Sequence, residues 1–145
     1  MFQVKTGENG FELKNSQQKL TLAGGKITLG NLSVEEPGEY EEGGIEIVYA
    51  EAAALVVWDK LQLVYVFGDQ APTPFEKAQF SPCDAVIFNQ SLPSITKSFF
   101  NNTLEQYDPS LVIVSAKTEL EEVRPSFKSE PIENLKLTDQ TLPEE

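Results

Sequence analysis

Apolar and polar residues alternate along the first part of the chain. Four segments place an apolar side chain at every second position: FQVKT, FELKN, KLTLA and KITLG. They are separated by GENG, NSQQ and AGG, which are rich in the residues that turns between strands use. This pattern predicts an antiparallel meander with one face buried and the other in water. Leu32 and Val34 continue it, and GIEIVYA resumes the alternation.

The pattern becomes almost continuously apolar in AALVVWDKLQLVYVFGDQ. This segment predicts two strands joined by a tight connection at Asp59 and Lys60. The second strand, residues 63–67, is apolar on both faces. Such a strand is typical of the centre of a sheet, with another sheet on one side and a helix on the other.

A short helix is predicted in TPFEKAQF. Thr73 is a suitable N-cap, Pro74 takes the first helical position, and Glu76 follows three residues after the cap. This is the signature of a capping box.

A strand, a helix and a strand follow in DAVIFN, SITKSFFNNTLEQY and LVIVSA. The helix is predicted from four apolar residues at helical spacing: Ile95, Phe99, Leu104 and Tyr107. The pair Asp108-Pro109 ends it, and the order indicates a βαβ unit. With LKLT as a last strand, the chain predicts an α+β fold of mostly antiparallel sheets with one or two helices. We expect one domain over residues 1–139 and a flexible tail over 140–145.

The charge narrows the choice of partner. The chain has 23 acidic and 11 basic residues, and its net charge of −12 repels phosphate backbones and anionic membranes. We therefore expect neither a nucleic acid nor a membrane as partner. The charge either maintains solubility or forms an acidic surface that docks onto a basic partner or mimics nucleic acid. The first residues do not read as a secretory leader, which favours a cytoplasmic location.

The chain contains no histidine and a single cysteine, Cys83. A Ser-His-Asp or Cys-His arrangement and a zinc site with imidazole ligands therefore cannot form. We expect no cofactor and no bound metal, and we expect Cys83 to be a small core residue.

Carboxylates are the remaining candidates for chemistry. Five glutamates lie in EEPGEYEEGG, which we interpret as a solvated turn between two strands, with Tyr40 packing inward. Asp69 lies just after the buried strand in LVYVFGD. A carboxylate at that position either contributes to a site at the strand end or simply ends the strand.

The order of these motifs resembles the metallo-β-lactamase fold. PGEYEEGGIEI, VYVFGDQ, CDAVIFN and PSLVIVS follow one another as in the small metal-dependent hydrolases of the ascorbate-lactonase-like branch, over about residues 26–116. The resemblance implies an αββα-type sandwich. It also implies a signature turn at Pro37, Gly38, Glu39, Tyr40 and Glu41, and it matches Asp69 to the metal-bridging aspartate of that family.

The departures from the family concern its metal ligands. The His-x-His-x-Asp-His segment has no counterpart, because KLTLAGG runs directly into KITLG, and no histidine stands near Ala116 and Lys117. The resemblance therefore implies a metal-free, catalytically inactive relative without catalytic residues. It would act by binding a protein partner or as a homo-oligomer. Two alternatives stay open: a carboxylate-dependent hydrolase using Asp69, and an acidic decoy of a nucleic-acid-binding protein.

Overall fold

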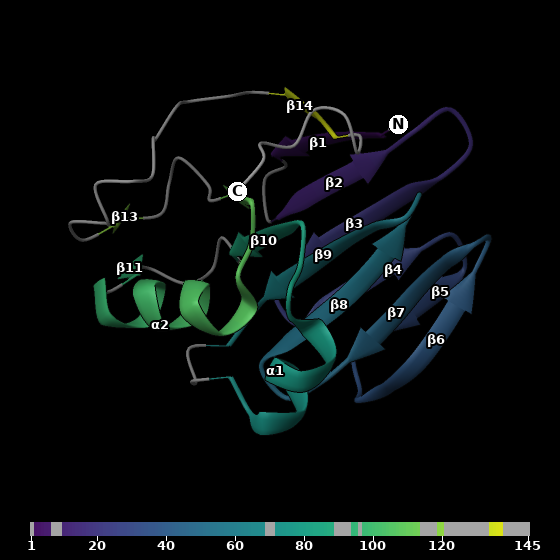
Figure 1. Ribbon diagram of the computed structural model, residues 1–145. Coiled ribbons are helices and arrows are strands. Elements are labelled where there is room, and N and C mark those ends of the chain that lie inside the picture. The colour runs from purple at the N-terminus through teal and green to yellow at the C-terminus, as the bar shows by residue number, and fades with distance from the viewer. Residues whose placement is uncertain are drawn as a thin grey trace.

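The fold is described from a computed structural model (Figure 1). It describes residues 2–6, 10–68, 72–88, 94–95, 97–113, 119–120 and 134–137. The proposed tail over residues 140–145 lies outside these ranges.

The first sheet is the predicted meander. Its strands are all antiparallel, in the order β14 (Asn134–Leu137), β1 (Phe2–Thr6), β2 (Phe11–Lys14), β3 (Lys19–Ala23), β4 (Lys26–Leu29) and β5 (Leu32–Val34). Leu13 faces Leu20 across β2 and β3, and Leu22 faces Ile27 across β3 and β4. These four side chains are buried, as the alternation predicts.

The second sheet is mixed. Its order is β12 (Leu111–Ile113), β10 (Ala85–Phe88), β9 (Leu61–Val66), β8 (Ala53–Trp58), β7 (Ile45–Tyr49) and β6 (Gly38–Glu42). Strands β6 to β9 pair antiparallel, and β9, β10 and β12 are parallel. The predicted connection at Asp59 and Lys60 is confirmed, and both residues have positive φ, at 51° and 69°. Two consecutive residues with left-handed backbone conformation are typical of a tight hairpin turn.

Both described helices of the chain follow β9. Helix α1 (Pro74–Phe80) has the predicted capping box, with Thr73 as N-cap. Helix α2 (Lys97–Tyr107) connects the parallel strands β10 and β12, which confirms the βαβ unit. The prediction for Ile95 was wrong. This residue pairs with Leu120 in a small parallel sheet of β11 (Ser94–Ile95) and β13 (Glu119–Leu120), because strand pairing here outweighs the helical spacing.

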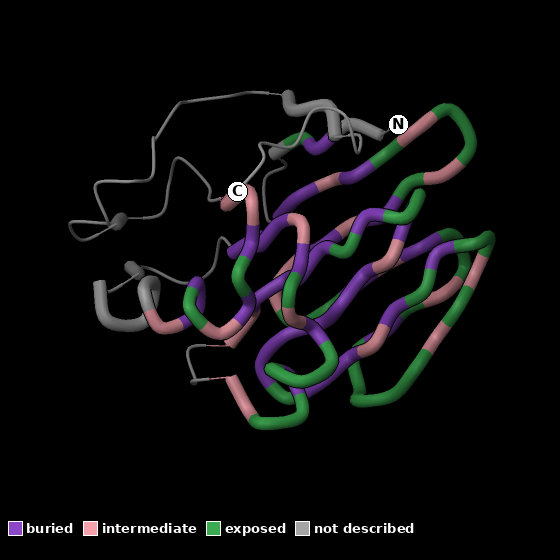
Figure 2. Tube along the Cα trace, in the orientation of Figure 1, coloured by how far each residue is buried: buried purple, intermediate pink, exposed green. Residues whose placement is uncertain are grey.

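Two apolar cores hold the layers together, and Figure 2 marks the buried residues along the strands in purple. The first lies between the two sheets, and the second lies between the second sheet and the helices. Strand β9 contributes side chains to both cores: Leu63 and Tyr65 lie in the first core, and Val64 and Val66 lie in the second. The predicted central position of this strand is therefore confirmed. Cys83 is buried in the second core, as expected.

The first sheet has a polar outer face in the part of the chain that the structure describes. Lys14, Lys19 and Lys26 are exposed there, and Glu12 pairs with Lys14 at 3.9 Å and with Lys19 at 3.6 Å. Helices α1 and α2 both pack on the second sheet instead. The fold is thus α+β with mainly antiparallel sheets and two described helices. None of the described helices has the length and apolar character of a membrane span.

The interpretation of the acidic segment as a turn holds only in part: the Gly pair reverses the chain between two strands, as predicted, but most of the segment before it is a strand. Gly38, Glu39, Tyr40 and Glu41 belong to β6, the edge strand of the second sheet, and Glu36 and Pro37 form a bend before it. The chain reverses later, at Gly43 and Gly44. Pairing of β6 with the half-buried strand β7 outweighs the low strand propensity of its glycine and glutamates.

Candidate functional site

The candidate site is the end of the second sheet at which the central strand β9 ends, and 'this edge' here means that end of the sheet. Asp69, the residue that the sequence marks here, lies outside the described residues, as do Ala116 and Lys117. The residues around this edge are described. They show how the chain is held just before residue 69, at Phe67 and Gly68, and further along, at Thr73 and Glu76.

A loop and a strand end are bound together at this edge. The N–H groups of Phe67 and Gly68 both donate to the carbonyl oxygen of Ala52, at 3.0 Å. The N–H of Ala52 in turn donates to Oε2 of Glu76, also at 3.0 Å. A Cβ atom at Gly68 would stand 3.1 Å from Cβ of Ala52, so the two backbone segments are closely packed. The approach to residue 69 is therefore fixed by backbone hydrogen bonds.

Glu76 is fully buried beneath this edge. Its Oε1 accepts from the N–H of Thr73 at 2.8 Å, and its Oε2 accepts from Ala52. Thr73 Oγ1 accepts from the N–H of Glu76 at 3.1 Å, which completes the capping box. Because each carboxylate oxygen is already hydrogen-bonded to the backbone, Glu76 ties helix α1 to the loop before β8.

Two tyrosines of the second sheet, Tyr65 on β9 and Tyr49 on β7, bind a turn of the first sheet at this end. The hydroxyl of Tyr65 donates to the carbonyl oxygen of Gly24 at 2.7 Å, and that of Tyr49 donates to Gly25 at 2.5 Å. Gly24 and Gly25 form the turn between β3 and β4. Phe67 stacks on Tyr49 with ring centroids 4.9 Å apart and lies 5.9 Å from Tyr65. The aromatic rings therefore fill the space between the two sheets at this end.

This packing raises the pKa of both phenol groups. Burial raises the pKa of Tyr65 well above its usual value, with a smaller contribution from Tyr49. Burial also raises the pKa of Tyr49, and the negative charge of Glu35 adds to the shift. Both groups are neutral hydrogen-bond donors near neutral pH, which suits a structural role.

The donor atoms present do not fit the metal centre that the resemblance noted in the sequence implies. The chain has no histidine. In the described ranges, no three His, Cys, Asp or Glu side chains come together in a way that could hold a metal ion. The buried carboxylate of Glu76 uses both oxygens for backbone N–H groups. A site that requires several imidazole ligands therefore has no counterpart in these residues.

The glutamates of the acidic segment do not converge on a common point. Glu35, Glu39 and Glu41 are exposed, and Oε1 of Glu41 accepts from the N–H of Gly44 at 3.1 Å. Tyr40 is half-buried and packs against the first core, which agrees with its predicted role. Its hydroxyl donates to the carbonyl oxygen of residue 36 at 2.8 Å.

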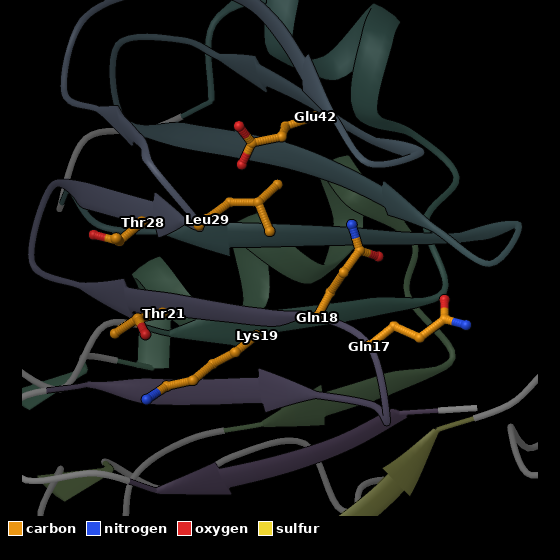
Figure 3. Close-up of a pocket in the computed structure, with 8 residues that line it drawn as sticks. Gln17, Gln18, Lys19, Thr21, Thr28, Leu29 and Glu42 are labelled. Atoms are coloured by element: carbon orange, nitrogen blue, oxygen red, sulfur yellow. The ribbon is translucent and has the colours of Figure 1, made fainter.

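A shallow depression of about 380 Å³ lies beside strand β6, and no motif in the sequence marks it. Its wall is formed by strands β3 and β4, their loops and the end of β6: Gln17, Gln18, Lys19, Thr21, Thr28, Leu29, Gly30 and Glu42. Figure 3 shows that the labelled side chains are spread over these elements and point in different directions. Gln18 Nε2 donates to the carbonyl oxygen of Gly43 at 2.8 Å. That bond links the meander to the hairpin of the second sheet, which indicates a structural contact rather than a binding pocket.

Comparison with known proteins supports the fold. The chain is similar to the crystal structure of a protein from Thermotoga maritima described as a zinc-dependent hydrolase of the metallo-β-lactamase superfamily. The TM-score is 0.59, the identity is 10%, and the match covers 79% of this chain and 75% of that one. No protein-family model and no curated protein matches the sequence. At this identity the likeness establishes a metallo-β-lactamase-like fold and nothing about activity.

Proposed function

We propose that this chain is a non-catalytic, metal-free domain derived from the metallo-β-lactamase fold, and that it functions by binding protein. In this proposal the domain is a shortened αββα sandwich of the ascorbate-lactonase-like branch. The fold likeness supports the origin, and the motif order in the sequence supports the branch.

The observation that carries the proposal is the packing of aromatic rings between the two sheets where β9 ends. Where the resemblance places the family's metal-binding segment, this chain makes a two-residue turn at Gly24 and Gly25. The carbonyl oxygens of that turn accept hydrogen bonds from Tyr65 and Tyr49, and Phe67 packs beside them. A hydrolase needs room at this edge for its ligands and its substrate. In this proposal the rings of Tyr49, Tyr65 and Phe67 take part of that room and strengthen the scaffold instead.

Metal analysis and hydrolase assays test the proposal directly. The purified chain should bind zinc and manganese at far below one ion per molecule and should not hydrolyse lactones or phosphodiesters. Stoichiometric metal together with turnover would overturn the proposal. Turnover without metal would favour the carboxylate-dependent alternative.

Replacing Asp69 by Asn separates these cases, with Asp108→Asn as a matched control. Asp108 is exposed just after helix α2, with φ of 48°, a conformation that asparagine also tolerates. Under our proposal Asp69→Asn changes stability by about 1 kcal/mol at most, the net worth of one hydrogen bond. If Asp69 were catalytic, the same substitution would abolish a measurable turnover that Asp108→Asn keeps.

A further inference from the structure

The edge strand β6 presents backbone groups that no described strand pairs. In the described part of the chain, β6 pairs only with β7. The connecting turn has two residues, Gly43 and Gly44, with Glu42 opposite Ile45. In such a hairpin the residues next to the turn form a hydrogen-bonded pair, and hydrogen-bonded pairs recur at every second position.

This register determines which groups of β6 are free. The backbones of Glu42 and Tyr40 face β7, opposite Ile45 and Ile47. The N–H and C=O groups of Glu39 and Glu41 therefore point away from β7, toward the open edge. They offer donors and acceptors to one further antiparallel strand.

The side chains on this edge determine what kind of strand fits. The side chains of Glu39 and Glu41 share one face of the sheet and are exposed. Glu41 also stands directly opposite the exposed Glu46, and like charges in that position repel. Within the described residues the recorded ion pairs belong to Glu12 on the first sheet, so these glutamates have no lysine or arginine partner there. A strand with basic side chains would supply the missing positive charge.

The same charges disfavour a second copy of β6 as the occupant. In an antiparallel pair of two β6 strands, the outward-facing residues would meet one another. Glu39 and Glu41 of one copy would then face glutamates of the other, which is unfavourable. The charges of this edge strand therefore favour a different, basic segment over a second copy of β6.

We propose that β6 binds an extended basic segment of a partner protein by strand addition. The segment carries Lys or Arg at two positions spaced by two, opposite Glu39 and Glu41. The residue between them is apolar, because it lies on the face where Tyr40 packs against the inter-sheet core. This inference rests on the proposed function, since it names the surface and the chemistry of the protein partner.

Blocked octapeptides of alternating lysine and valine provide the probe. The lysines that face Glu39 and Glu41 must use their own backbone N–H groups for pairing. N-methylation of the lysine amides should therefore weaken binding by about tenfold or more. N-methylation of the valine amides, which leaves the composition unchanged, should alter binding by less than about twofold, because those amides face away from β6. An alternating glutamate and valine peptide should not bind.

Protein variants and amide exchange locate the binding. Glu39→Gln and Glu41→Gln should each weaken binding of the lysine peptide, whereas Glu105→Gln, which removes the same charge from an exposed site on α2, should not. The amides of Glu39 and Glu41 should exchange rapidly in the free protein and become protected by the peptide. Those of Tyr40 and Glu42 should be protected in both states.

Equal binding of the two N-methylated peptides, binding of the glutamate peptide, or no binding of the lysine peptide at low salt would each overturn the proposal. The remaining reading would then be that the glutamates protect the edge against aggregation. None of these results touches the non-catalytic assignment, which depends on metal content and turnover. Conversely, detected turnover would overturn that assignment and leave the peptide result standing.

Discussion

Replacing Glu76 should destabilise the fold more than replacing any exposed glutamate. Its carboxylate is fully buried and accepts from the N–H groups of Thr73 and Ala52, at 2.8 and 3.0 Å. In Glu76→Gln one oxygen becomes an amino group, so one of these backbone donors loses its acceptor and faces another donor. An unsatisfied buried donor costs roughly 1–3 kcal/mol, and the loss of negative charge at the start of α1 costs about 0.5 kcal/mol more.

We therefore expect Glu76→Gln to lower the free energy of unfolding by about 2–3 kcal/mol. Glu76→Ala should lower it by about 3–5 kcal/mol, because both donors lose their acceptor and a cavity remains. Urea unfolding followed by the fluorescence of Trp58, the single tryptophan, measures both changes. Trp58 is 2% exposed, so its emission should change strongly when the fold opens.

Glu105→Gln is the control, because Glu105 is exposed on α2 and should change stability by no more than about 0.5 kcal/mol. Thr73→Ala, which removes the other half of the capping box, should cost about 1 kcal/mol. Its effect should not add fully to that of Glu76→Gln, since the two side chains form one network. If Glu76→Gln were as stable as Glu105→Gln, the assignment of Glu76 as the tie between α1 and the loop before β8 would be wrong.

Three further predictions concern the tyrosines and the turns. Burial raises the pKa of Tyr65 and Tyr107 above the usual value of 10.0. Their contribution to stability is therefore complete below pH 10 and decreases as the pH rises further, which urea midpoints between about pH 8 and pH 11 should show. Gly43→Ala should lower the melting temperature through a loss of about 1–2 kcal/mol, because φ is 59° and a Cβ would collide with the side chain of Gln18. Lys60→Gly should raise it through a gain of about 0.5–1 kcal/mol, because φ is 69° at that turn position.

Most of the fold could be predicted because its strands carry strong local patterns. The meander alternates with period two, β9 is apolar on both faces, and the capping box at Thr73 and Glu76 is contained in four residues. In each case the residues that decide the structure are neighbours in the sequence. Strand β6 was missed because Pro37 and Gly38 indicate a turn, while the force that makes it a strand is pairing with β7.

The tyrosine contacts beside the candidate site could not be predicted for a related reason. The hydroxyl of Tyr49 reaches a carbonyl 24 residues away, and that of Tyr65 reaches one 41 residues away. No local pattern marks a tyrosine that will bond to a distant glycine turn. The sequence shows that histidine ligands are missing, but only the structure shows that aromatic rings pack between the two sheets at this end.

The two proposals together predict that a basic peptide stabilises the fold and that zinc does not. Strand β6 contributes little to either core, since only Tyr40 and Glu42 are even half-buried, and it is held mainly by pairing with β7. A strand of this kind is among the first elements to open.

A peptide that pairs with β6 binds only the folded state and stabilises it, by about 2.7 kcal/mol at a concentration one hundred times Kd. Under the proposed function zinc has no site through which to stabilise the fold, and in the described residues no three His, Cys, Asp or Glu side chains come together in a way that could hold a metal ion. The lysine and valine peptide should therefore raise the melting temperature, and zinc chloride should not. A rise with zinc alone would refute the metal-free assignment, and a rise with neither would refute strand addition.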